Sequence, residues 1–439
     1  MTTMAGLAPK DGGQSVQAAV KGSAPVATGP LLAADGMRLD KKLAQVTRRA
    51  RIRAFMLVAP LLLFVLIFFV TPIFQMVRLS IGDDMIATEM PRTTAALRTW
   101  DQKALPGEEA YAALMADLKD ARERQATGKV GAKINYVYSG ARSLFVSAGR
   151  SAGSMAAPFK PQLIEKDPLW GDPTLWVMLK NASQPRTSIN YLNALDRTLG
   201  PTGDVIQVPE DQRIHITIFL RTLWLSFLVT GLCMLFGYPV AYLLAHLPLR
   251  TSNLLMICVL LPFWTALLVR ITAWIALLQN DGVVLSAAVA LGLVDPANRP
   301  QLVYNLTGTL VAMVHVLMPS MILPLYSVMK TIPPTYVRAA RSLGATSFTA
   351  FWRVYFPQTL PGIAAGGLLV FILAVGYYIT PALLGGQSGV LISNFIELHV
   401  SKTLNWGLAA ALAGLLLLAI LVLYWVFNKI VGIDRLKMG

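Results

Sequence analysis

The stretch AFMLVAPLLLFVLIFFVTPIFQMVR, residues 54–78, is an almost uninterrupted run of apolar side chains. An α-helix needs about 20 apolar residues to cross a hydrocarbon core of about 30 Å, so this run predicts a membrane-spanning helix. It is too long for a signal-peptide core, and Phe74, Gln75 and Met76 follow it instead of a small-residue cleavage pattern. We therefore expect the helix to be retained.

Five further stretches have the same character, and none shows the period-two alternation of a membrane β-barrel. They are residues 216–246, 253–279, 304–329, 361–384 and 406–430. Of all 439 residues, 55% are hydrophobic and only 14% are charged, which is about half the charged share of a soluble domain. The sequence therefore predicts an all-α membrane protein with six transmembrane helices.

The distribution of basic residues predicts the orientation of these helices. Four arginines, Arg48, Arg49, Arg51 and Arg53, precede the first span. The loops on the same side carry Arg250, Lys330, Arg338, Arg341, Arg353, Arg435 and Lys437. Because cytoplasmic loops are enriched in Lys and Arg, both termini are expected in the cytoplasm. This arrangement accounts for the net charge of +15 without a nucleic-acid partner.

The rest of the chain is predicted to divide into tails and one large insertion. Residues 1–53 form a basic, disordered cytoplasmic tail, and residues 431–439 form a short one. The insertion, residues 79–215, has sixteen basic and sixteen acidic residues and lies outside the membrane. A block of five helices, 216–430, follows it.

Two parts of the insertion predict a small packed domain. The segment Glu108–Gln125 places Tyr111, Leu114 and Leu118 at helical spacing, which predicts an amphipathic helix. Further along, Trp170, Trp176, Tyr191 and Leu195 provide large side chains for a core.

The loop between the fourth and fifth predicted spans is the most informative one. Its sequence is KTIPPTYVRAARSLGATSFTAFWRVYFPQTLPGI, Lys330–Ile363. Thr335 is placed to cap a helix after two prolines, and Gly344 suits the left-handed position that ends it. Thr346 or Ser347 would cap a second helix, which Pro357 and Pro361 would end. The pattern predicts a helix–glycine–helix elbow at the membrane face, residues 330–360.

This elbow resembles the EAA coupling loop of ABC-importer permeases. The resemblance rests on Ala339-Ala340, Gly344 and Val354-Tyr355-Phe356-Pro357. Three further motifs in order, GYPVAYLLA (237–245), LLPFWTALLVRI (260–271) and MPSMILPLYSVM (318–329), are similar to the spermidine/putrescine branch of that family. Arg338 departs from the family's usual Glu, and the 79–215 insertion is longer than that branch has.

The resemblance implies a fold of the type I ABC importer permease kind in a bacterial inner membrane, and it also implies partners. These are two copies of an ATPase subunit, a second permease subunit that is related but distinct, a periplasmic solute-binding protein and membrane lipid. It assigns ATPase coupling to Arg338, Ala339, Ala340, Leu343, Gly344, Phe351 and Pro357.

Enzyme chemistry finds no support in the residues. The chain has no Walker A pattern, no zinc-ligand spacing and no G-x-S-x-G elbow. We therefore predict no catalytic residue, no cofactor and no metal, and we place ATP hydrolysis in the separate subunit.

The predicted spans contain no Asp or Glu. Candidates for the translocation path are Trp264, Arg270, Tyr377 and Tyr378. Arg270 either lines the path or is a snorkelling or internally paired arginine, and His315 is expected to be neutral and hydrogen-bonded to a neighbouring helix. Gly366-Gly367 predicts close helix packing in the fifth span.

The transported solute is expected to be a polyamine or a related small organic solute, chosen by the separate binding protein. Other solute classes, such as amino acids or opines, stay open as alternatives. A secondary transporter is a further one, although neither an inverted repeat nor ionisable groups at the membrane midplane are visible.

Overall fold

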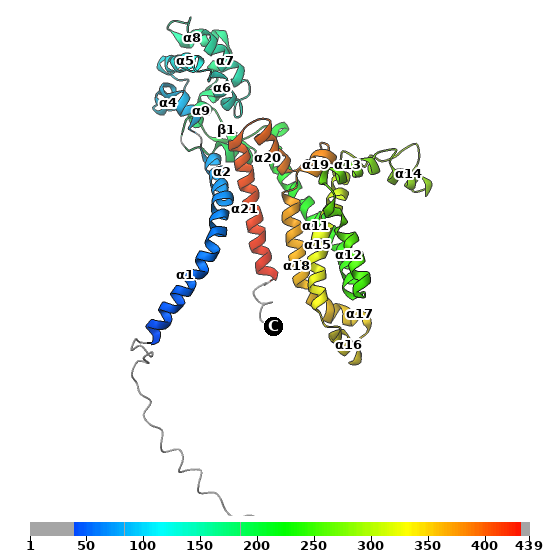
Figure 1. Cartoon of the computed structure of the whole chain (residues 1–439). Coiled ribbons are helices and arrows are strands. Elements are labelled where there is room, and N and C mark those ends of the chain that lie inside the picture. Colours follow the sequence, from blue (N-terminus) through cyan, green and yellow to red (C-terminus); the bar gives the residue numbers. More distant parts are fainter. Residues whose placement is uncertain (1–38, 83, 185, 432–439) are drawn as a thin grey trace, which may run out of the picture. The chain divides into compact units, whose positions relative to one another are not determined.

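The computed structural model describes residues 39–82, 84–184 and 186–431, so most of the two predicted tails lies outside the described residues. The chain divides into two compact units, Met1–Ile73 and Phe74–Gly439. Six helices are long and apolar enough to cross a membrane (Figure 1). They are Thr47–Ile81, His215–His246, Leu267–Ala290, Leu306–Thr331, Ser347–Val375 and Trp406–Lys429. The predicted six-helix architecture is therefore confirmed.

The first span begins earlier than its apolar run. The α-helix α1 (Leu39–Val65), the π-helical turn η1 (Leu66–Val70) and α2 (Thr71–Ile81) follow one another without a break. In the wide turn, the Thr71 N–H donates to the Leu66 carbonyl oxygen, and Thr71 Oγ1 donates to the same atom at 2.9 Å. The side chains of the apolar run are mostly exposed, as expected of a helix surrounded by lipid.

Three long helices form the centre of the second unit. They are α11 (His215–His246), α15 (Leu306–Thr331) and α18 (Phe356–Val375). Their buried side chains make one core that includes Val229, Cys233, Leu317, Met321 and Val370. Gly362 and Gly366 bring α18 close to α15: a Cβ on Gly366 would lie 2.9 Å from Met321 Sδ and 3.1 Å from the Met321 carbonyl oxygen. This small-residue spacing is one that membrane helices use to approach closely.

The predicted third and fifth spans are wrong as single helices. Residues 253–279 divide into α12 (Leu249–Trp264) and α13 (Leu267–Leu278), because Thr265 and Ala266 adopt extended backbone with ψ of 144° and 140°. The predicted 361–384 helix ends at Val375, and α19 (Ile379–Leu384) is separate.

The remaining helices of the membrane part are short α14 (Val283–Ala290), α20 (Ile392–Ser401) and the final span α21 (Trp406–Val431). The helix α21 packs against α20 and against α10 of the insertion.

The inserted domain, residues 84–214, is helical apart from one hairpin. Its helices are α3 (Met85–Glu89), α4 (Pro91–Arg98), α5 (Glu108–Glu123), α6 (Thr127–Asn135), α7 (Ala141–Ser151), α8 (Phe159–Lys166), α9 (Pro173–Ala182) and α10 (Ile189–Ala194), with 3-10 turns η2 (Pro168–Gly171) and η3 (Glu210–Gln212). Strands β1 (Arg197–Leu199) and β2 (Val205–Gln207) pair antiparallel, with Arg197 opposite Gln207. The hairpin is the departure from the all-α prediction.

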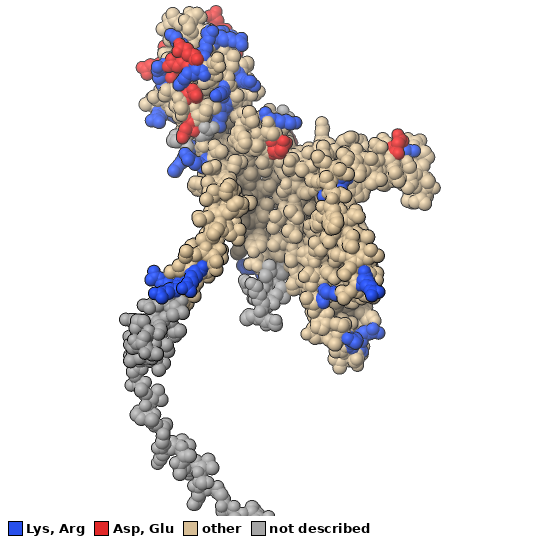
Figure 2. Space-filling model, in the orientation of Figure 1, with Lys and Arg blue, Asp and Glu red and all other residues tan. Residues whose placement is uncertain are grey.

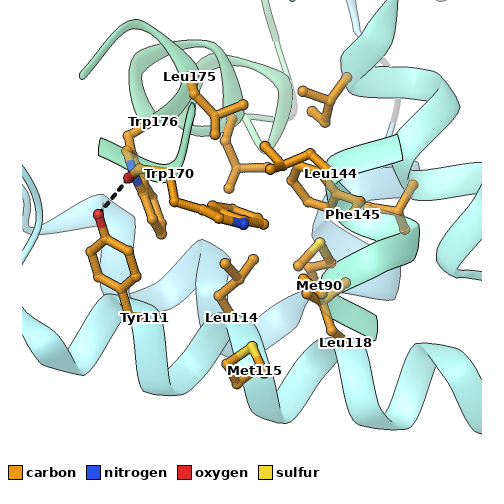
Figure 3. Close-up of a cluster of buried hydrophobic side chains, with 14 of the residues drawn as sticks. Met90, Tyr111, Leu114, Met115, Leu118, Leu144, Phe145, Trp170, Leu175 and Trp176 are labelled. Atoms are coloured by element: carbon orange, nitrogen blue, oxygen red, sulfur yellow. Dashed lines mark hydrogen bonds between the residues drawn. The ribbon is translucent and has the colours of Figure 1, made fainter. Parts of the chain in front are cut away.

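The core of the inserted domain contains the predicted Trp170 and Trp176 (Figure 3), whereas the predicted Tyr191 packs against a different cluster that includes residues of α21. Tyr111 Oη and Trp176 Nε1 both donate to the Trp170 carbonyl oxygen, at 2.7 and 3.1 Å. Burial raises the pKa of Tyr111 to about 12, so its hydroxyl remains a donor at neutral pH. The predicted amphipathic helix is α5, and Leu114 and Leu118 are fully buried. Leu195, in contrast, is 44% exposed and was wrongly placed in the core.

The two ends of the inserted domain meet. Ser80 Oγ lies 2.9 Å from Tyr191 Oη, and Asn190 Nδ2 donates to the Ser80 carbonyl oxygen at 3.1 Å. Asp196 then caps the first turn of α11, because its carboxylate accepts the N–H groups of His215 and Ile216 at 3.0 and 2.9 Å. The chain therefore leaves the end of α2 and returns to the membrane helices at one place.

Candidate coupling site

The elbow begins with α16 (Pro334–Ser342), a short helix with no buried side chain. The predicted cap Thr335 is wrong, because the N-cap is Pro333 and no side chain bonds to the first turn. The fixed backbone angle of Pro334 favours a helix start without a polar cap. In Figure 2 the basic side chains gather at the end of the bundle that carries α16, whereas the inserted domain carries both signs of charge.

Gly344 closes α16 as predicted. Its φ is 91°, in the left-handed region. The Gly344 N–H donates to the Arg341 carbonyl oxygen at 3.0 Å, and the Ala345 N–H donates to that of Ala340 at 3.1 Å, which is the Schellman pattern of a helix C-terminus. A Cβ on Gly344 would meet no atom within 4 Å. Glycine is therefore required at this position by the left-handed backbone conformation, and not by a lack of space for a side chain.

The second arm of the elbow runs directly into the fifth span. Thr346 caps α17 (Ser347–Ala350) by accepting the Thr349 N–H at 3.2 Å. A π-helical turn, η4 (Phe351–Tyr355), then leads into α18 without a break. Pro357 and Pro361 were predicted to end this arm, and that is wrong. Pro357 instead follows the wide π-helical turn directly, and the helix continues through both prolines.

The two faces of α16 have different surroundings. Residues Pro334, Val337, Arg338 and Arg341 recur every three or four positions and line a cavity between α16 and the ends of α11 and α15. Tyr336, Ala339 and Leu343 lie on the other side of the helix; Tyr336 is 52% and Leu343 89% exposed. Ala339 and Leu343 thus belong to the outer face, and Arg338 belongs to the inner one.

An aromatic cluster fixes the elbow to the membrane helices. Phe351 stacks on Tyr355 with ring centroids 5.8 Å apart, and Tyr242 of α11 meets both rings edge-on at 5.8 and 5.4 Å. Phe351 was predicted as an anchor for a docking protein, but the structure packs it half-buried into the bundle. Its neighbours Phe348 and Trp352, 73% and 46% exposed, are the exposed aromatic residues that the sequence analysis missed. Their positions three and one residues away on the same arm were the available signal.

Two of the four predicted path residues lie together. The Arg270 guanidinium of α13 acts electrostatically on both Tyr377 and His315. Its Nε and Nη1 atoms are buried without a hydrogen-bond partner among the described residues. Trp264 is 86% exposed at the end of α12, and Tyr378 is 44% exposed, so the described structure does not bury these two with Arg270.

His315 has the hydrogen bond that was predicted. Trp274 Nε1 of α13 donates to His315 Nδ1 of α15 at 3.1 Å. An indole N–H is a donor only, so Nδ1 carries no proton in this arrangement and the ring is neutral. Among the residues that the structure describes, no group of three His, Cys, Asp or Glu side chains is placed to hold a metal ion.

The fold and the elbow together define a multi-pass helical membrane protein with an exposed loop at one end of its helix bundle. Residues 235–432 match the family model of the binding-protein-dependent transport system inner membrane component. The chain is 31% identical over 222 residues to the spermidine/putrescine transport system permease protein PotB of Escherichia coli, covering 50% of this chain and 80% of that protein. It is 33% identical to PotB of Haemophilus influenzae, covering 50% and 77%.

A third relative is the inner membrane ABC transporter permease protein YdcU of E. coli, 31% identical over 230 residues, with 49% of this chain and 71% of YdcU covered. The chain therefore belongs to the family of ABC-importer inner-membrane permeases, in the branch that resembles spermidine/putrescine permeases. A chain of a bacterial alginate ABC transporter in complex with a periplasmic protein is 19% identical with a TM-score of 0.40, covering 49% of this chain and 78% of that chain.

Proposed function

We propose that this chain is one permease subunit of an ATP-driven importer that moves polyamines, or a related small organic solute, by alternating access. Its partners are two copies of an ATPase subunit, a second permease and a periplasmic solute-binding protein. Both termini face the cytoplasm, because the described basic residues of the elbow and of residues 48–53 then lie on one side. The relatives' names support the polyamine solute, and the family model matches residues 235–432, within the transport block.

The observation that carries this proposal is the exposed outer face of the elbow. Leu343 and Phe348 expose 89% and 73% of their surface although both are apolar. Apolar side chains grouped on a water-facing loop are typical of a protein interface. The second arm is continuous with α18, so a displacement of the elbow by the ATPase moves the fifth span directly.

An exposed-leucine pair tests the coupling role. We expect Leu343→Asp to reduce both co-purification of the ATPase subunit and uptake of radiolabelled putrescine and spermidine in the host bacterium. Leu293→Asp is the matched control, because Leu293 is 76% exposed in a different loop. Equal retention of the ATPase by both variants would show that the elbow is not its docking site.

Selection of the solute is assigned to the binding protein, because the helices α11, α13, α15, α18 and α21 contain no carboxylate to hold a polyamine. The partly buried Arg270 provides a test that separates solute classes. If cations pass beside it, Arg270→Gln raises polyamine uptake because a repulsive charge is gone. If the solute carries a carboxylate, as amino acids and opines do, the same variant loses uptake of that solute. Uptake assays with putrescine and with anionic amino acids separate the two classes, and unchanged transport of every solute would leave Arg270 with a structural role.

A further inference from the structure

A cavity of about 660 Å³ lies beneath the coupling elbow. The inner face of α16 forms one wall, and the last turns of α11 and α15 form the other, with Tyr242 and Lys330 among the lining residues. The helix α11 has 32 residues, about 48 Å at 1.5 Å per residue, so its end extends past a hydrocarbon core of about 30 Å. A hydrocarbon core centred on α11 would place this end of the helix, and the cavity beside it, at the depth of the lipid headgroups.

The charge in this cavity is of one sign. Lys330, Arg338 and Arg341 line it, and no Asp or Glu does. Lys330 Nζ donates to the Ala245 carbonyl oxygen at 3.2 Å, whereas Arg338 and Arg341 make no ion pair with any residue that the structure describes. The sequence offers no carboxylate nearby, because no Asp or Glu occurs between Asp295 and Glu397. The three cations therefore give this cavity a positive potential that no described carboxylate offsets, which favours an anion from outside the chain.

The remaining walls of the cavity are apolar, which favours an anion that also has an apolar part. Met329, Ile332 and Val337 line the same cavity, together with the rings of Phe351 and Tyr355. A ligand that fits has a negative group and an apolar part. The outer face with Ala339 and Leu343 is on the other side of α16, so an ATPase docked there would leave this cavity uncovered.

We propose that the cavity binds the phosphate of an anionic phospholipid, with Arg338 and Arg341 on the phosphate and the apolar wall beside the glycerol and upper acyl chains. Basic pockets between membrane helices at the headgroup level are suited to such lipids. The lipid would hold the inner face of α16 while the outer face contacts another protein. This site does not depend on the proposed solute or on transport.

Binding is measured on the purified, delipidated full chain, by native mass spectrometry during titration with short-chain phosphatidylglycerol or phosphatidylcholine. One basic residue near an anionic membrane surface is worth a factor of about five in affinity. We expect Arg338→Gln and Arg341→Gln each to weaken phosphatidylglycerol binding about fivefold, and the double variant about 25-fold. The double Lys variant, which keeps both charges, should stay within about twofold of the wild type.

The matched control is Arg353→Gln, which removes an exposed charge from the same elbow outside the cavity. The proposal is overturned if this control weakens binding as much as Arg338→Gln, because the attraction is then a general surface effect. It is also overturned if phosphatidylcholine binds as tightly, or if inorganic phosphate displaces the lipid at equal concentration. Lipid displaced by the purified ATPase subunit would assign the cations to that interface instead. Because the assay uses neither solute nor ATP, its failure leaves the proposed transport function intact.

Discussion

Gly366 and Gly367 are neighbours on α18 with opposite surroundings, which makes them a matched pair. A Cβ on Gly366 would lie 2.9 Å from Met321 Sδ and 3.1 Å from the Met321 carbonyl oxygen, whereas on Gly367 it would meet only Thr230 Cγ2, at 3.9 Å. A contact of 3.1 Å to backbone is relieved only when α15 and α18 move apart. Overpacking of this kind costs about 1–3 kcal/mol.

Because the two positions are adjacent in one helix, the intrinsic gain of replacing glycine by alanine, about 0.5–1 kcal/mol, is common to both and cancels in their difference. We therefore expect Gly366→Ala to be less stable than Gly367→Ala by about 1–3 kcal/mol. The measurement is the free energy of unfolding of the full chain in mixed micelles of mild detergent and SDS.

A larger side chain at the same two positions should give a larger difference. Leucine at position 366 should prevent the α15–α18 contact altogether and give a chain that is degraded or misfolded, while leucine at position 367 should be tolerated. Equal stability of the two alanine variants, or a lower stability of Gly367→Ala, would refute the idea that close approach at Gly366 holds these spans together.

Three further predictions concern the elbow and the inserted domain. Gly344→Val should reduce solute uptake strongly while Gly344→Asn keeps most of it, since a left-handed backbone costs ordinary residues about 1–2 kcal/mol and asparagine less; equal uptake would show that φ at Gly344 is not required. Asp117→Ala should destabilise the inserted domain by about 1–3 kcal/mol, because buried Asp117 accepts the Thr93 N–H and Oγ1–H at 2.7 and 2.8 Å. The control Asp120→Ala loses an exposed ion pair with Arg92 and should cost at most about 1 kcal/mol. Limited proteolysis of the full chain compares the stability of the two variants. Burial, and secondly His215, hold the pKa of His399 below its ordinary 6.5, so the folded chain takes up this proton less readily than the unfolded one. Thermal stability should therefore fall as the pH drops below about 6.5, with a shallower fall in His399→Gln, and identical slopes would contradict the assignment.

The membrane architecture follows from the sequence because the main stabilising energy, the transfer of apolar side chains into the bilayer, depends on each segment alone. Long apolar runs are stable only in helices that cross the bilayer, and this determines six spans without knowledge of any contact. The breaks at Thr265–Ala266 and after Val375 have no such local signal. Pro262 lies inside α12, yet the extended conformation of the two residues after Trp264 depends on how α12 and α13 pack.

The sequence predicted where the coupling elbow turns, but not which face of α16 points toward the other helices. Gly344 and Thr346 carry their conformational preference in their own chemistry, and both occupy the predicted positions. The family resemblance assigned Arg338 and Leu343 to one docking surface, although five residues on a helix place them about 140° apart. That angle was available from spacing alone. The direction in which each face points was not, because it depends on the cavity formed by α11 and α15.

The hydrogen bonds that join Ser80 to Tyr191 and Asn190 have an evolutionary and a practical consequence. When the segments that enter and leave a domain lie against each other, the domain can be acquired by a single insertion. No span has to change its position, and only one short gap has to be closed. The same geometry makes residues 84–184 a replaceable segment. The transport block should still assemble when this segment is replaced by a few glycines, or by a reporter domain of similar end-to-end distance.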